Sequence, residues 1–203
     1  MRNQLLCRGT TFLYLRRSLT NWLCRGASTS SKQKRLPASY YRGGTSRAII
    51  LQQKHLPRSC DWDDIFLGIV GSPDHNGRQL DGLGGGISSL SKICVVGPST
   101  HPDADVDYTF AAIGVKNRKV DYSSNCGNMT SAIGPFAVDA GLVDAAEGDV
   151  TVRIHNTNTG KLIHATFPVE DGEATAYGSF AIDGVAGTAA KIMLAFISPV
   201  LVS

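Results

Sequence analysis

The chain has 203 residues, enough for one domain with its own core or a little more. Its formal net charge of +3 is unevenly distributed, because residues 1–60 contain twelve basic and no acidic residues, whereas residues 61–203 contain eight basic and all seventeen acidic ones. Nucleic-acid binding requires a basic folded surface, and no window offers the ~20 apolar residues of a membrane span. We therefore expect neither nucleic acid nor membrane as a partner.

Residues 1–35 are typical of a mitochondrial transit peptide. They contain arginine, leucine and serine but no acid, and they include the stretch "GASTSSKQK". We predict a disordered, removable leader and a mitochondrial location; the alternative is an unstructured basic tail. Of the five cysteines, Cys7 and Cys24 lie in this leader, and the other three show no zinc-site spacing, so we predict no metal site.

From Leu36 the pattern changes to an extended segment, a glycine turn and an apolar strand at residues 48–51. Arg42 stands at the mouth of the turn. The turn itself offers backbone and hydroxyl donors, so the stretch is a candidate anion cradle. The alternative is a hairpin turn with a solvated arginine.

Residues 62–70 follow with one apolar helical face, a cap at Ser59 or Asp61, and Gly71 as the end. A glycine-rich loop then leads into a short buried strand at residues 93–96. This loop is not a phosphate loop, because Lys92 follows Ser91 and opens a strand instead of a helix. Lys92, beside a hydroxyl-rich loop, is a candidate base, although a lone lysine is more often a solvated charge.

The stretch "SSNCGNMTSAIGPFAVDAGLV" places Cys126 in a polar turn before a helical apolar pattern that runs from Met129 to Ala140. Gly141 would close this helix, and Pro135 would kink it. A helix N-terminus stabilises a thiolate and binds carboxylates. Cys126 is therefore a candidate functional thiol, and the alternative is a small buried apolar residue.

A strand at residues 106–115 precedes this helix, and a β-hairpin follows it, with alternating apolar residues from Val150. We interpret His155 and His164 in the hairpin as surface residues. Strands thus surround one strongly apolar helix. This order predicts an α+β fold in which a curved, mostly antiparallel sheet encloses the helix.

Four stretches together resemble one family: "YRGGTSR", "GSPDHNGRQLDGLGGGISSLSK", "VDYSSNCGNMTSAIGPFAVDAGLV" and "IDGVAGTAAKI". They are similar to the PrpF family of methylaconitate and methylitaconate isomerases and 4-oxalomesaconate tautomerases. The resemblance implies the diaminopimelate-epimerase-like fold, with two similar domains and the active site between them. Tyr41, Arg47 and the apolar "GGGISSLSK" depart from the usual pattern, which bears on the substrate more than on the reaction.

The implied reaction moves a double bond in an unsaturated di- or tricarboxylate by a 1,3-proton shift, with no metal or cofactor. By motif, the catalytic residues fall on Lys92 and Cys126. The carboxylate-binding residues would be Arg42, Gly43, Gly44, Thr45, Ser46, Ser91, Asn125, Gly127 and Asn128. A proton next to a conjugated carboxylate is acidic enough for a positioned amine or thiolate, and fixed donors stabilise the dienolate.

The resemblance also implies domain boundaries, with residues 36–183 as the first domain and 184–203 as the start of a second. We expect the final residues to be unpaired, the chain alone to be a poor enzyme, and its exposed apolar face to favour a homodimer. Two alternatives stay open. One is a non-catalytic half-protein or binding remnant; the other, a serine acyl-hydrolase, rests on Ser89 and Lys92 spelling SxxK.

Overall fold

The structure is a computed structural model that describes residues 11–14 and 35–197. Within these residues ten strands form one sheet. The strands are β1 (Thr11–Tyr14), β2 (Arg35–Gly43), β3 (Ser46–Gln52), β4 (Lys92–Pro98), β5 (Val106–Ile113), β6 (Val120–Asp121), β7 (Gly148–Asn156), β8 (Lys161–Glu170), β9 (Glu173–Ala174) and β10 (Met193–Ile197). The α-helices are α1 (Trp62–Val70) and α2 (Gly127–Asp139), and 3-10 turns occur at Gln53–His55, Ser59–Asp61 and Ser88–Leu90.

The strand order is β1-β2-β3-β4-β5-β7-β8-β10, with β6 paired to β5 and β9 paired to β8. β3–β4 and β5–β7 are parallel, whereas the other pairs are antiparallel. Parallel neighbours need a crossover connection. α1 lies in the crossover between β3 and β4, and α2 lies in the crossover between β5 and β7.

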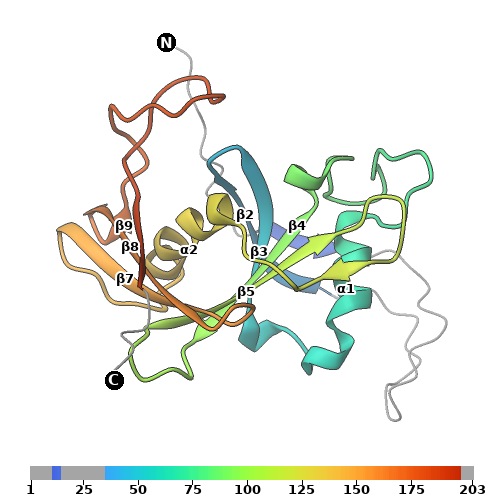
Figure 1. Ribbon diagram of the computed structural model, residues 1–203, viewed down its shortest axis with the longest axis horizontal. Coiled ribbons are helices and arrows are strands. Elements are labelled where there is room, and N and C mark those ends of the chain that lie inside the picture. Colours follow the sequence, from blue (N-terminus) through green and yellow to red (C-terminus); the bar gives the residue numbers. More distant parts are fainter. Residues whose placement is uncertain (1–10, 15–34, 198–203) are drawn as a thin grey trace, which may run out of the picture.

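The two helices cover opposite faces of the sheet. Along β4, Cys94 and Val96 belong to the core around α2, whereas Ile93 and Val95 belong to the core around α1. This alternation is the period of a strand that is buried on both faces. The strands curve around α2, and α1 packs outside them (Figure 1). The predicted α+β fold, a curved sheet enclosing one helix, is confirmed.

Helix α2 contributes many of the buried residues in the core on its side of the sheet, as its apolar pattern predicts. Met129 and Ile133 are fully buried. The helix passes so close to β8 that a Cβ on Gly134 would lie 2.7 Å from the ring of Phe167. Gly141 follows the helix with φ 64°, the left-handed conformation that suits glycine after a helix C-terminus. The kink predicted at Pro135 stays a prediction.

Helix α1 also lies where the sequence places it, and it ends at Gly71 with φ 77°. Its predicted cap differs in detail. Asp61 occupies the N-cap position, but its side chain makes no capping hydrogen bond. The residue belongs to a preceding 3-10 turn, which delivers the chain into the helix without a side-chain cap.

The chain termini differ from the expectation at two places. Met193–Ile197 form β10, which pairs antiparallel with β8, so the prediction that the final residues are unpaired is wrong for this segment. Thr11–Tyr14, inside the predicted disordered leader, form β1 and pair with β2. Residues 1–10, 15–34 and 198–203, which hold the rest of the predicted leader and the end of the chain, lie outside the described residues.

His155 is not the surface residue that we expected. Its side chain is 18% exposed, and its Nδ1 lies 2.9 Å from Oδ1 of Asp107. The parallel register of β5 and β7 places these two residues directly opposite each other. The ring of His101 packs against the ring of His155 with centroids 5.1 Å apart.

Candidate functional site

The turn between β2 and β3 packs against the N-terminus of α2. A Cβ on Gly43 would lie 2.0 Å from the backbone oxygen of Asn128, a distance that no real Cβ can have. Gly44 adopts φ 52°, a left-handed conformation that glycine adopts without strain. The side-chain amide of Asn128 donates a 2.9 Å hydrogen bond to Oγ1 of Thr45. Two segments 83 residues apart in sequence are thus held together by glycine and an amide.

Lys92 joins this group from β4. It is the first residue of the strand and is half-buried. Its Nζ donates a hydrogen bond of 2.9 Å to Oγ of Ser46, a side chain that is 2% exposed. Since β3 and β4 are parallel, Ser46 and Lys92 start their strands at the same end of the sheet. The lysine therefore lies beside the glycine turn, in a fixed position.

Cys126 occupies the N-cap position of α2, and its thiol makes no capping bond. Thr130 organises the turn: its hydroxyl lies 3.1 Å from Oδ1 of Asn125 and 3.0 Å from the backbone oxygen of Cys126. The cysteine is half-buried and packs against the α2 core. The thiol thus stands at the positive end of the helix dipole, where a developing negative charge is stabilised.

A buried thiol, Cys94, lies behind these groups. It donates a long 3.8 Å contact to the hydroxyl of Tyr108, which is also fully buried. Burial is the main cause that raises the pKa of Cys94, which reaches about 12 although the hydrogen bond with Tyr108 lowers it. Cys94 therefore stays a neutral thiol at pH 7.

Two predicted binding residues have other partners in this structure. The exposed Arg42 donates from Nε to the backbone oxygen of Gly44 at 3.0 Å, so it folds onto its own turn. Ser91 is fully buried and donates to Oε1 of Gln79 at 2.6 Å and to the backbone oxygen of Ile87 at 2.9 Å. A buried hydroxyl with two acceptors has no surface to offer a ligand, so Ser91 supports the glycine-rich loop.

Gln79 is the residue around which that loop folds, and the sequence pattern did not reveal it. It is 1% exposed, and it receives hydrogen bonds from Ser91 and from the backbone N–H of Gly86. A Cβ on Gly84 would lie 2.2 Å from its Oε1. The glycines of this loop therefore make room for a buried amide. A single glutamine in a polar segment carries no pattern that would have identified this role.

The assembled site combines a lysine side chain, a thiol at a helix N-terminus, and a turn rich in N–H and O–H donors. Gly127 opens α2, and a Cβ there would meet nothing within 4 Å. Such a group of donors and positive charge suits carboxylate groups. Within residues 11–14 and 35–197, no three His, Cys, Asp or Glu side chains are arranged to hold a metal ion, and no helix is long and apolar enough to cross a membrane.

Comparison with known proteins matches the chain to one family model, described as PrpF protein, over residues 33–201. A 3-methylitaconate isomerase from Eubacterium barkeri is 49% identical over 82% of this chain and 43% of its own length. A 2-methyl-aconitate isomerase from Cupriavidus necator is 42% identical over 84% of this chain and 46% of its own. The chain thus spans less than half the length of these relatives.

Solved structures give the same result for the fold. The crystal structure of a methylitaconate-delta-isomerase superimposes with a TM-score of 0.77 at 49% sequence identity, and the match covers 79% of this chain and 41% of that one. The aligned part includes most of the described residues, so the fold and the sequence of this chain are both similar to those of the same protein.

Proposed function

This chain belongs to the PrpF family, and from that premise we propose that it isomerises an unsaturated di- or tricarboxylate by a cofactor-independent 1,3-proton transfer. The proposed substrates are of the aconitate, methylaconitate, methylitaconate or oxalomesaconate type. The names of the relatives support this class, because both curated relatives described above are isomerases of methylated unsaturated acids. The activity is proposed for this chain, which covers less than half of each relative.

One observation carries the proposal: Nζ of Lys92 is held 2.9 Å from Ser46 beside the turn that packs on the N-terminus of α2. A carboxylate bound at this turn would place its neighbouring allylic carbon near a fixed amine. The helix N-terminus and the turn donors would stabilise the negative charge that spreads onto the carboxylate when a proton leaves.

In the proposed mechanism Lys92, as the free amine, removes a proton from the allylic carbon. The C–H electrons form a new double bond, the old double bond shifts its electrons toward the carboxylate, and a dienolate results. The thiol of Cys126 gives a proton to the other end of the three-carbon unit, and proton exchange with solvent restores both groups. No net electron is gained or lost, so the reaction needs no redox partner.

Proton exchange in deuterium oxide tests this proposal directly. We expect the purified chain to exchange the allylic protons of methylitaconate or cis-aconitate, observed by proton NMR, at a rate far below that of a full-length relative. Lys92→Ala should lower this rate at least a hundredfold. Lys116→Ala, which removes an exposed lysine outside the site, is the matched control and should keep the wild-type rate. Equal rates in both variants would overturn the assignment of Lys92.

The exchange assay, run beside a binding assay and an ester-cleavage assay, separates the alternatives. A non-catalytic binding protein would bind the carboxylate without exchange, whereas a serine acyl-hydrolase would cleave an activated ester. The SxxK interpretation has little support, since Ser89 lies in a 3-10 turn and Lys92 donates to Ser46. Acyl transfer by Ser89 would need the lysine as its partner.

Two further parts of the proposal concern location and assembly. We infer a mitochondrial location from the acid-free arginine- and serine-rich composition of residues 1–35. A homodimer is supported by large apolar side chains that stay exposed along the C-terminal segment, namely Tyr177, Phe180, Ile182, Met193, Phe196 and Ile197. Sequencing the N-terminus of protein recovered from mitochondria and sedimentation of the purified chain test these two points.

A further inference from the structure

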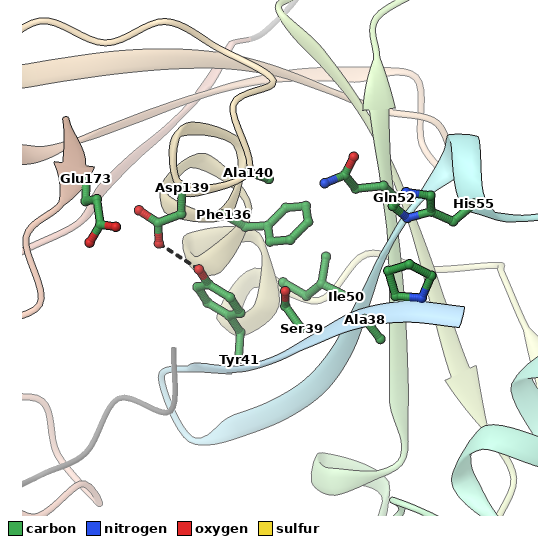
Figure 2. A pocket seen from close by; sticks show the side chains of 11 residues that line it. Ala38, Ser39, Tyr41, Ile50, Gln52, His55, Phe136, Asp139, Ala140 and Glu173 are labelled. Atoms are coloured by element: carbon green, nitrogen blue, oxygen red, sulfur yellow. Dashed lines mark hydrogen bonds between the residues drawn. The ribbon is translucent and has the colours of Figure 1, made fainter. Parts of the chain in front are cut away.

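A cavity lies at the opposite end of α2 from Lys92 and Cys126. It has a volume of about 280 Å³, and its lining includes Phe136, Asp139 and Ala140 from the end of the helix. α2 has 13 residues, so roughly 20 Å of helix separates this cavity from the thiol. None of the residues in the predicted site lines it. Figure 2 shows it between the helix end and strands β2 and β3.

The cavity has an apolar floor and a polar rim. Ile50, Phe136 and Ala140 form the apolar part. On the rim, the hydroxyl of Tyr41 points at Asp139 and donates to its Oδ2 at 2.7 Å (Figure 2). The backbone N–H of Ala174 donates to the other oxygen of Asp139 at 2.9 Å. A carboxylate can accept about four hydrogen bonds, so Asp139 keeps acceptor capacity toward the cavity.

The charge of the lining is negative. Asp139 contributes a carboxylate whose two hydrogen bonds come from neutral donors, and no lysine or arginine is among the described residues that line the cavity. Burial, and next the charge of Lys54, lower the pKa of His55, so its imidazole is neutral at pH 7. The C-terminal end of α2 adds the negative pole of the helix dipole. The cavity therefore favours a cation.

Two polar atoms at the cavity have no hydrogen-bond partner among the residues that the structure describes: Oε1 of Gln52 and Nδ1 of His55. Both side chains line the cavity. An unpaired buried acceptor costs free energy, and native structures keep such groups mainly where they serve a ligand or a function. The last torsion of a glutamine is soft, so the amide of Gln52 can turn its oxygen into the cavity.

We propose that this cavity binds a small organic cation, a primary ammonium on a short apolar stem. An ammonium group has three N–H donors. The carboxylate of Asp139, the hydroxyl oxygen of Ser39 and the amide oxygen of Gln52 are the acceptors that the cavity offers. The stem lies on Ile50 and Phe136. The volume equals that of about nine water molecules in the liquid, which is ample for four carbons and an ammonium.

The probe is n-butylammonium, with butyrate and n-butanol as controls of the same stem and different charge. On the whole chain, n-butylammonium raises the unfolding temperature in a concentration-dependent manner, and the two controls do not, because binding to the folded state alone stabilises it. Equal shifts with butyrate or butanol would overturn the proposal, since the cavity would then recognise only the apolar stem.

Variants at Gln52 test the acceptor. Gln52→Leu removes the unpaired oxygen, so it should raise the unfolding temperature without ligand and abolish the shift with n-butylammonium. Gln52→Glu places a carboxylate there and should lower the dissociation constant at least tenfold. Gln53→Glu puts the same charge one residue away, on an exposed side chain that does not line the cavity, and should stay within twofold of wild type.

Wild-type affinity in Gln52→Leu contradicts the proposal, and so does an equal gain in the two glutamate variants. If Gln52→Leu does not fold, the two glutamate variants still decide. These readouts measure ammonium binding alone, so they hold whether or not the chain isomerises a carboxylate.

Discussion

The two ends of α2 differ in charge although they belong to one buried helix. At the N-terminus, where Cys126 is the N-cap, the amide of Asn128 donates to Thr45 and Nζ of Lys92 donates to Ser46 of the same turn. At the C-terminus, Asp139 and Glu173 gather acceptors around a cavity. The hairpin of β2 and β3 serves both ends, with its turn at one and the middle of β2 at the other. A helix enclosed by a sheet thus carries the proposed anion site and the proposed cation site on the same scaffold.

An acid at a helix C-terminus is unfavourable by itself, because the dipole places negative charge there. Asp139 is tolerated because the hydroxyl of Tyr41 and the backbone N–H of Ala174 donate to its two oxygens. The N-terminal end needs no such compensation, since a thiol and donor groups agree with the positive pole. The stability of the C-terminal end therefore depends on these two donors, whereas the N-terminal end needs no equivalent pair.

The largest expected effect is a loss of unfolding free energy when the packing at the N-terminal end of α2 is disrupted. Gly43→Ala places a Cβ 2.0 Å from the backbone oxygen of Asn128, so the turn must move away from the helix, and we expect a loss of about 3 kcal/mol or more in unfolding free energy. Gly127→Ala is the matched control, because its Cβ meets nothing within 4 Å; alanine at a helical position should stabilise by up to about 1 kcal/mol. Urea unfolding measures both, and similar values for the two would refute the close packing.

The next effect concerns the C-terminal end. Tyr41→Phe removes the donor to Oδ2 of Asp139 while keeping the edge-to-face contact of the ring with Phe136. Because a partly buried carboxylate oxygen loses its partner, we expect a cost of about 1–3 kcal/mol. Urea unfolding measures this cost, and proton exchange at the Lys92 site should stay at the wild-type rate. A loss of exchange would show that the two ends are coupled.

A smaller effect concerns the rate of proton exchange, which should depend on the N-terminal end of α2 and not on the C-terminal end. Ser46→Ala removes the acceptor that holds Lys92, and we expect proton exchange to slow about tenfold, or about 1.4 kcal/mol, through misplacement of the amine. Ser46→Thr should restore much of the rate, which a general loss of packing would not allow. Ser39→Ala, in the cavity at the C-terminal end of α2, is the matched serine and should leave the exchange rate unchanged.

The smallest effect is a pH dependence at the C-terminal cavity. Burial, followed by the charge of Lys54, lowers the pKa of His55 from its usual 6.5, so the unfolded chain binds a proton more readily than the folded one. The stability contribution of the neutral imidazole is present above pH 6.5 and is lost as the pH falls through the lower folded pKa.

Unfolding measured at several pH values between 7 and 5 should therefore show a small decline in wild type. His55→Gln removes the titrating group and should flatten this part of the curve. His75→Gln, which changes an exposed histidine in a polar loop, is the control and should keep the decline. A decline that persists in His55→Gln would assign it to another group.

Local patterns predicted the elements well. The apolar spacing from Met129 and the glycine at position 141 are properties of neighbouring residues, and they located α2 and placed Cys126 at its N-terminus. The turn of Gly43 and Gly44 was recognised for the same reason, since glycine permits left-handed backbone. Resemblance of four motifs added the family and its fold, which no single motif specified.

Interactions between distant segments were not predictable from these patterns. Gln79 gives no sequence signal because its partners are a serine and a glycine N–H brought together by loop folding. His155 was taken for a surface residue, since only the parallel register of β5 and β7 sets it against Asp107. β10 was expected to be unpaired, because nothing local shows that it returns to the edge of β8.

By itself the sequence determined which residues form the helix and the turn, because hydrophobic period and glycine conformation act over a few residues. Only the tertiary structure decided what each end of α2 meets. Lys92 is 46 positions from Ser46, and Tyr41 is 98 positions from Asp139. Such pairs form because strand order and register bring them within hydrogen-bond distance, and that order results from burying both faces of the sheet at once.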